Sequence, residues 1–157
     1  MQLNDEVELL RKVPLFSGIE PAKLKLLAFT SERMNFDKGQ SLMRQGEMGN
    51  AAYLILSGEA DVLADAGGGP VKVASVGRNG FVGEMAILRD QPRTATVTAA
   101  TNVSTLKITK ESFFQLIEDS PKIAVELMRI LAQRLEVTTI DLTDAREKLR
   151  AAGIKEN

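Results

Sequence analysis

Hydrophobic residues recur at helical spacing near the start of the chain. Two helices are predicted there, because Pro14 ends the first periodic stretch and Pro21 suits the first position of the second. Their apolar faces consist of Leu3, Val7 and Leu10 in the first helix and of Leu24, Leu27 and Ala28 in the second. Residues 1–30 are therefore expected to form an N-terminal helical segment.

The middle of the chain, residues 31–108, changes to short apolar runs rich in β-branched residues and separated by glycines. Such closely spaced turns favour a sandwich, barrel or roll over an alternating βα sheet. The run Gly67-Gly68-Gly69-Pro70 is interpreted as a flexible hairpin tip. It is a poor phosphate-binding P-loop, because no Gly-Lys-Ser/Thr sequence follows it.

Helical periodicity returns at the C-terminal end, where a short helix is predicted over 110–119 and a long one from Pro121 to about Arg150. The long helix carries a heptad seam of Ala124, Met128, Leu131, Leu135, Thr138, Leu142, Ala145 and Leu149. This stripe either lies on its own domain or pairs with a second copy of the chain. Pairing of the distal half is favoured, since little chain remains after Ile140 to cover it.

The composition narrows the functions that the chain can perform. The 157 residues are enough for one domain with a core, and the net charge of −1 gives no general attraction to nucleic acid or anionic lipid. There is no cysteine and no histidine. This excludes Ser-His and Cys-His nucleophile pairs and histidine-ligated metal sites, so a cupin-type oxygenase is not expected. Enzymes that work with carboxylates or lysine alone are the remaining catalytic alternative, but we expect no catalysis. The first residues lack a long apolar run, so we expect a cytoplasmic protein without a membrane segment.

Candidate chemistry is concentrated in residues 80–97, with the sequence GFVGEMAILRDQPRTATV. Gly83 precedes a short run of helix-forming residues, and Glu84 at its start has oxygens that accept hydrogen bonds from a sugar hydroxyl. Arg93 can hold a phosphate through two parallel hydrogen bonds, with the hydroxyl of Thr94 beside it. Taken singly, these residues fit an ordinary turn, a solvated surface loop, or a salt bridge between Glu84 and Arg93.

Taken together, residues 81–97 resemble the phosphate-binding cassette of cyclic-nucleotide-binding domains, which occur in catabolite activator proteins, kinase regulatory subunits and nucleotide-gated channels. That cassette reads approximately Phe-Gly-Glu-(Leu/Met)-Ala-Leu, a short loop, and Pro-Arg-x-Ala-Thr-Val. Here Val82 replaces the phenylalanine, with Phe81 just before it. The resemblance extends to the opening segment VPLFSGI (13–19) and to the turns and strands over 36–62, which are taken as fold residues.

The resemblance implies a role for each cassette residue. Glu84 would accept a hydrogen bond from the ribose 2′-hydroxyl, and Arg93 would neutralise the cyclic phosphate. Thr94 would bond a phosphate oxygen or the exocyclic amine of a syn guanine. The remaining implied ligand-binding residues are Val82 and Gly83, Met85 and Ala86 through their backbone amides, Ala95 through close backbone approach, and Thr138 and Thr139.

The two threonines belong to the segment RLEVTT (134–139), which resembles the Thr-Ser segment of catabolite activator proteins that reaches the adenine amine across a dimer interface. Thr138 also lies on the heptad seam, and it is equally well interpreted as a polar seam residue.

The sequence therefore predicts an α+β fold with an eight-stranded β-roll between N-terminal helices and a long C-terminal helix. We expect one domain over 1–157, with helices in 1–30, the roll in 31–108 and helices in 109–150. It would bind cAMP in preference to cGMP, use no further cofactor, perform no catalysis, and signal through the last helix. The alternative is a ligand-free interaction or dimerisation domain of the same fold.

Further partners are expected beyond the cyclic mononucleotide. They are a second copy of the chain at the C-terminal helix and an unknown protein effector, since only eight residues follow Leu149 and no output domain is recognised. No contact with nucleic acid or a membrane is expected of this chain.

Overall fold

The computed structural model describes residues 3–154, without the side chains of Leu3, Asn4 and Met85. The chain begins with α1 (Leu3–Arg11), the short 3-10 helix η1 (Pro14–Phe16) and α2 (Pro21–Thr30). The strands are β1 (Glu32–Phe36), β2 (Ser41–Met43), β3 (Ala51–Ser57), β4 (Ala60–Asp65), β5 (Pro70–Val76), β6 (Phe81–Val82), β7 (Thr96–Ala99) and β8 (Val103–Thr109). The remaining helices are α3 (Glu84–Arg89), between β6 and β7, and α4 (Lys110–Asp119) and α5 (Pro121–Ala151) after the last strand. The predicted α+β fold, with eight strands and a long C-terminal helix, is confirmed.

The strands form two four-stranded antiparallel sheets, with the orders β1-β8-β3-β6 and β2-β7-β4-β5. Strand β3 is buried on both of its faces. Its side chains alternate between the faces, and each face packs in a separate hydrophobic cluster. Tyr53 and Ile55 belong to a core cluster that also includes Val97 of the second sheet. Ala52, Leu54 and Leu56 belong to a second cluster, formed with the helices. The roll therefore has an interior between its sheets and a separate helical layer outside.

The glycine run joins β4 to β5, as predicted, and Asp65 pairs with Pro70 at the base of the hairpin. Oδ1 of Asp65 accepts hydrogen bonds from the backbone N–H groups of Gly67 at 2.8 Å and Gly69 at 3.2 Å. These bonds close the turn without any phosphate-like ligand, in agreement with the interpretation as a hairpin tip.

Three phenylalanines connect the helices to the sheet below them. Phe81 of β6 meets Phe16 edge-on, with ring centroids 6.4 Å apart, and stacks on Phe113 of α4 at 5.5 Å. Ile123 and Leu127, in the first turns of α5, are buried in the same cluster. The segment that precedes α3 is thus packed directly against the helices that lead into α5.

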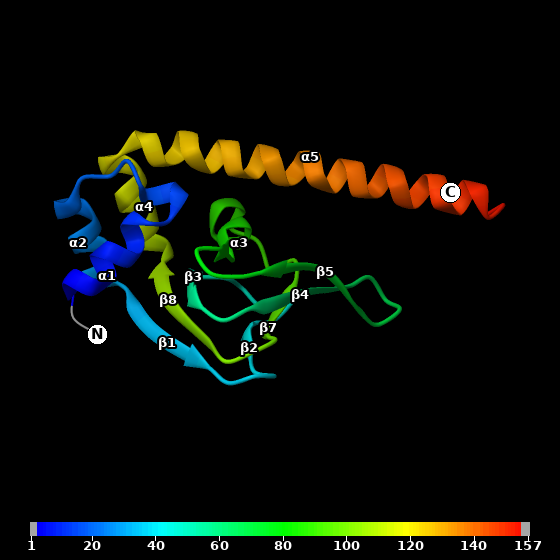
Figure 1. Cartoon of the computed structure of the whole chain (residues 1–157), viewed down its shortest axis with the longest axis horizontal. Helices are drawn as coiled ribbons and strands as arrows, with labels where there is room; N and C mark the ends of the chain where they lie inside the picture. Colours follow the sequence, from blue (N-terminus) through cyan, green and yellow to red (C-terminus); the bar gives the residue numbers. More distant parts are fainter. Residues whose placement is uncertain (1–2, 155–157) are drawn as a thin grey trace.

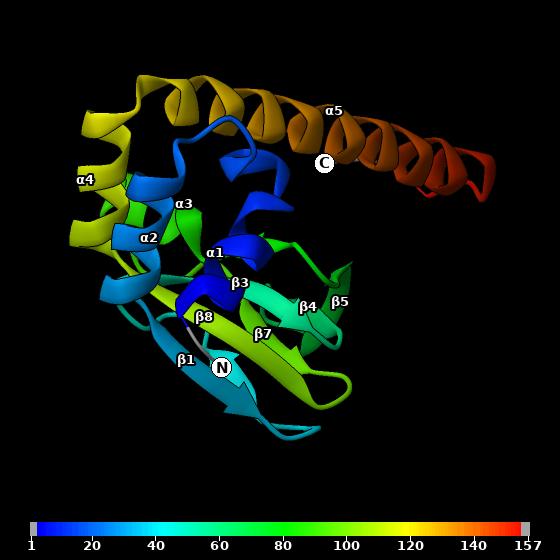
Figure 2. The same cartoon turned by 60° about the vertical axis from the view of Figure 1, so that its left-hand side comes forward.

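Helix α5 crosses above α3, and its distal half extends beyond the two sheets (Figures 1 and 2). Its first turns are covered by the domain, but every described residue from Ala132 onward is exposed. The heptad seam is largely uncovered: Met128, Leu135, Leu142 and Leu149 are 61%, 67%, 51% and 42% exposed. Within residues 3–154, no helix is both long and apolar enough to cross a membrane.

Candidate functional site

The segment from Gly83 to Arg93 is a compact turn-helix-turn that connects β6 of the first sheet to β7 of the second. Gly83 adopts the left-handed conformation, with φ 90° and ψ 0°, which costs little in glycine because it has no Cβ. Six helix-forming residues then make α3, and Asp90 ends it in a second left-handed conformation with φ 54°. The carboxylate of Asp90 bonds the ammonium of Lys110 at 3.0 Å, so the far end of α3 is tied to α4.

Arg93 folds back beneath this turn and is only 7% exposed. Its guanidinium donates to the carbonyl oxygen of Gly83 at 3.0 Å and to that of Ala51 at 2.6 Å. Its backbone N–H donates to Glu47 O at 2.7 Å. The interpretations of Arg93 as a solvated loop residue and as the ion-pair partner of Glu84 are therefore both wrong.

Two glycines leave the space that the guanidinium occupies. A Cβ atom on Gly49 would lie 2.7 Å from Cζ and 2.9 Å from Nε of Arg93, and 2.8 Å from Cβ of Ala86. A Cβ atom on Gly83 would lie 2.6 Å from Nη1 of Arg93. The lack of a side chain at Gly49 and Gly83 thus leaves room for the guanidinium at this one position. The sequence alone did not reveal this role of Gly49.

The electrostatic environment of Arg93 is that of a buried cation. Burial lowers the pKa of its guanidinium, while electrostatic interactions with Tyr53, Glu47 and Glu84 oppose that shift. Burial likewise raises the pKa of the Tyr53 phenol, and the positive charge of Arg93 acts in the other direction. Among the described residues, no carboxylate lies within 4.0 Å of the Arg93 guanidinium to neutralise it.

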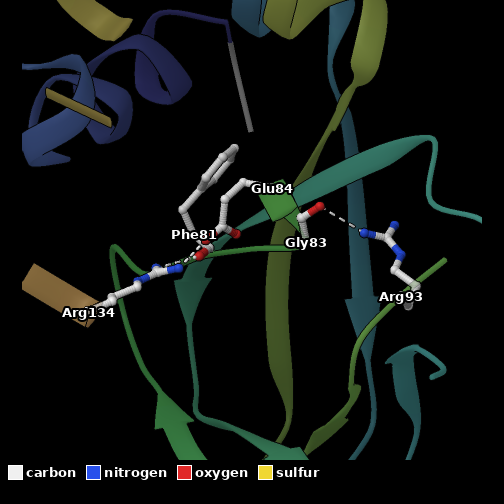
Figure 3. Close-up of polar contacts among 5 residues, drawn as sticks. All are labelled: Phe81, Gly83, Glu84, Arg93 and Arg134. Carbon is white, nitrogen blue, oxygen red and sulfur yellow. Dashed lines mark hydrogen bonds and ion pairs between the residues drawn. The ribbon is translucent and has the colours of Figure 1, made fainter. Parts of the chain in front are cut away.

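Glu84, the first residue of α3, is 2% exposed and meets a different arginine. Nη1 of Arg134, on α5, donates to Oε1 of Glu84, and Nη2 of Arg134 donates to the carbonyl oxygen of Phe81 at 2.9 Å. Figure 3 shows Arg134 approaching Glu84 on one side of Gly83, while Arg93 reaches the Gly83 carbonyl from the other. The cassette is therefore joined directly to the C-terminal helix.

Sequence reasoning did not identify Arg134 as a site residue, although a signal was present. Residues 123, 127, 130 and 134 recur at spacings of four, three and four, one position before the predicted seam. Ile123 and Leu127 on this face are buried, and Ile130 is partly buried. The face that contacts the domain is thus a second stripe, and its only polar member is the arginine that reaches Glu84.

The structure brings some of the predicted site residues together and leaves others apart. Val82 and Ala86 are buried beside Gly83 and Glu84, Ala95 is half-buried, and Thr94 is exposed. The backbone of Met85 lies in α3, but its side chain is outside the described part of the structure. Thr138 and Thr139 lie on the exposed half of α5, where Thr139 Oγ1 donates to Leu135 O at 2.8 Å.

Within residues 3–154, no group of three or more carboxylate, histidine or cysteine side chains is arranged to hold a metal ion.

Comparison with known proteins assigns the fold and its cassette to a class. The family model of the cyclic nucleotide-binding domain matches residues 33–120, so the chain belongs to that family. A CRP-like cAMP-activated global transcriptional regulator of Mycobacterium tuberculosis is 30% identical over 138 residues, which are 87% of this chain and 62% of that protein. A cAMP-dependent protein kinase regulatory subunit of Aspergillus niger is 35% identical over 108 residues, covering 69% of this chain and 26% of the subunit.

A solved structure shows the same likeness in three dimensions. The crystal structure of the Thermus thermophilus catabolite activator protein superposes with a TM-score of 0.75 at 29% identity, over 85% of this chain and 63% of that one. The chain thus spans less than two thirds of the length of these relatives. Their names describe regulators, and the expected resemblance to the cyclic-nucleotide-binding family is confirmed.

Proposed function

We propose that this domain binds a cyclic mononucleotide, with cAMP favoured over cGMP, and that binding is transmitted through α5. The observation that carries the proposal is the buried guanidinium of Arg93, which no carboxylate of the described residues neutralises. A buried charge is costly when it is unpaired, and the single negative charge of a cyclic phosphate matches it in sign and size. Two of the five N–H donors of Arg93 bond backbone carbonyls, so donors remain for a phosphate oxygen.

Glu84 would read the ribose of the same ligand. Its Oε1 accepts the hydrogen bond from Arg134, and a carboxylate has about four lone-pair sites, so it could also accept the 2′-hydroxyl while that ion pair is kept. The ligand would then contact a residue that is bonded to α5. A ligand shifts a conformational equilibrium only when it binds the two states unequally. We infer that the ligand binds more tightly to the state in which Glu84 and Arg134 are in contact than to the state in which they are apart.

The purine would be read by hydroxyl groups. Thr94 is exposed directly after Arg93, and Thr138 and Thr139 are exposed on α5, one turn and more beyond Arg134. We propose that α5 moves over the bound base, or that a partner's α5 does so, and that the two threonines then meet the amine of adenine. The exposed seam is the surface for a second copy, and the effector that receives the signal is a separate protein or domain.

The competing function is a ligand-free interaction domain. One observation favours it: within the described residues, every buried side-chain nitrogen and oxygen already has a hydrogen-bond partner in the protein. Hydrogen bonds to carbonyl dipoles do not neutralise a charge, however, and the unneutralised guanidinium of Arg93 favours the anion-binding function.

Isothermal titration calorimetry of the chain with cAMP, cGMP and cyclic di-GMP tests the proposal. We expect saturable binding of cAMP, weaker binding of cGMP, and no binding of the dinucleotide. Arg93→Gln should weaken cAMP binding by about 2–5 kcal/mol, the range for truncating one partner of a buried charge pair. Arg129→Ala, which removes an exposed arginine of α5, is the matched control and should leave the affinity unchanged. Absence of heat with all three ligands, from a folded protein, would establish the ligand-free function instead.

A further inference from the structure

A groove of about 280 Å³ runs between α2 and α4, away from the cassette. Its floor consists of the buried side chains of Leu27 and Leu116, and Leu26 forms part of its apolar wall. We propose that this groove binds an amphipathic helix of a partner protein, through one apolar anchor residue with a basic residue on each side. The proposal goes beyond nucleotide binding and does not depend on it.

Two large apolar side chains of α2, next to each other on its surface, are exposed rather than buried in the core. Leu26 is 56% exposed, and Phe29, three residues later on the same side of α2, is 75% exposed. Single exposed apolar residues are ordinary, but Leu26 lines the groove and Phe29 neighbours Leu26 on the surface of α2, so the two extend the apolar surface from the groove as a patch of the kind that marks binding surfaces. A groove between two helices accepts a third helix through one face of it, with anchors spaced three or four residues apart.

The charges around the groove specify the partner's chemistry. Glu111 and Asp119 are exposed lining residues on α4, and their separation of eight residues corresponds to about 12 Å along the helix. Lys23 is the one cation among the described lining residues. Its ammonium is already directed to the end of α4, where it donates to Asp119 O at 2.7 Å and to Ser120 Oγ at 3.2 Å.

The lining therefore carries two carboxylates, from residues eight positions apart on α4, against one ammonium that is held at the end of α4, so its net charge is negative. A partner helix with lysine or arginine four residues before and four residues after its anchor spans the same eight residues, and each cation then lies near one carboxylate. An acidic helix would meet like charges at both ends. The expected occupant is thus a basic amphipathic helix.

Fluorescence anisotropy with the full chain and two labelled helical peptides tests this assignment. The first peptide has a central leucine with lysine four residues to either side, and the second has glutamate in place of both lysines. We expect the lysine peptide to bind at least about tenfold more tightly than the glutamate peptide. Leu26→Ser should weaken its binding by about tenfold or more, while Val71→Ser, at a similarly exposed valine of β5, should not.

Charge reversal separates a specific groove from a merely sticky surface. The double variant Glu111→Lys and Asp119→Lys should transfer the preference to the glutamate peptide, with circular dichroism confirming that α4 is retained. The proposal is overturned by equal affinity for both peptides, by no binding at about 1 mM peptide, or by amide shifts outside α2 and α4 in the NMR spectrum of the complex. It is also overturned if Leu26→Ser abolishes self-association of the chain, since the groove would then pair two copies.

Discussion

Arg134 of α5 is bonded to Glu84 of α3, so the last helix is held to the cassette by a side chain 50 residues further along the chain. Arg134 also donates to the carbonyl oxygen of Phe81, whose ring stacks on Phe113 of α4. The residue proposed to read the ribose and the helix proposed to transmit the signal are therefore in direct contact. A change at Glu84 needs no intermediate element to reach α5.

Arg134→Ala should destabilise the domain, because it leaves the nearly fully buried carboxylate of Glu84 without its cation. The arginine side chain itself is 45% exposed, so solvent screening limits the loss to about 1–3 kcal/mol of the free energy of unfolding. Arg129→Ala removes a surface arginine paired with Glu126 on the same helix, and should change that free energy by less than about 0.5 kcal/mol. Urea denaturation of both variants measures the difference. Equal losses would show that the Arg134 contact contributes no more than a surface pair.

Gly49→Ala should move the Arg93 guanidinium out of its place, since the added Cβ would lie less than 3 Å from two of its atoms and from Ala86. We expect weaker cAMP binding and a loss of about 1–3 kcal/mol in the free energy of unfolding, as for other over-packed interior sites. Gly68→Ala, in the hairpin tip, adds a Cβ with nothing within 4 Å and is the matched control. Calorimetry and urea denaturation on the pair decide whether the close approach at Gly49 is needed. Unchanged cAMP affinity in Gly49→Ala would contradict this.

Tyr53 provides a spectroscopic probe of the charge on Arg93, because it is the only tyrosine and the chain has no tryptophan. Burial raises the pKa of its phenol, while the positive charge of Arg93 lowers it. Phenolate absorbance should therefore titrate above pH 10 in the folded protein. Bound cAMP, which neutralises Arg93, should move the midpoint higher still, and so should Arg93→Gln.

The raised pKa of Tyr53 also makes the free energy of unfolding depend on pH. The folded state holds the Tyr53 proton more tightly than the unfolded state, so this contribution is fully present below about pH 10 and is lost as the pH rises through the folded pKa. Tyr53→Phe should reduce the alkaline decline in the free energy of unfolding. If neither cAMP nor Arg93→Gln changes the midpoint of the Tyr53 titration, the charge of Arg93 has no effect on the phenol.

The fold was predictable because local patterns and packing agree in this chain. Leu24, Leu27 and Ala28 form the buried face of α2, as their helical spacing predicts. The glycine run before Pro70 became the hairpin tip, and Gly83 preceded a short helix as expected. Each of these features depends on residues close together in sequence.

The site was predictable only in part, because its contacts join distant segments. The resemblance of residues 81–97 identified Glu84 and Arg93 but not what surrounds them. The carbonyl of Ala51 and the space left by Gly49 come from the region around β3, and Arg134 comes from α5. The stripe of residues 123, 127, 130 and 134 on α5 was also missed, because the sequence pattern predicts the heptad seam one position later as the main apolar face of the helix. Helical periodicity does not show which of two adjacent apolar faces is covered by the helix's own domain.

Glu84→Gln should weaken cAMP binding by about 1–3 kcal/mol if the carboxylate accepts the ribose 2′-hydroxyl. The same change should matter far less for 2′-deoxy-cAMP, which lacks that donor. Calorimetry with two proteins and two ligands forms a cycle whose interaction energy isolates the bond. Arg134→Ala, which removes the protein partner of Glu84 but leaves its charge, is the control for indirect effects. Additive losses around the cycle would place the action of Glu84 outside ribose recognition.

Leu142→Asp should prevent the chain from self-associating. Leu142 is 51% exposed in the middle of the uncovered seam, so an unpaired carboxylate would be buried there only if two copies of α5 pair. The roll should keep its stability within about 0.5 kcal/mol, since the substitution touches none of its buried residues.

Ile140→Asp is the matched control, because Ile140 is 54% exposed but lies on the opposite side of the helix from the seam. Sedimentation velocity over a range of protein concentrations, with and without cAMP, measures the state of each variant. A seam that is short and carries Thr138 and Ala145 should give a dimer whose population rises with concentration, and further with cAMP if the ligand fixes α5. Dissociation by Ile140→Asp rather than Leu142→Asp would assign pairing to the other face of α5. A parent chain that stays monomeric at high concentration in both ligand states would mean that α5 serves its own domain alone.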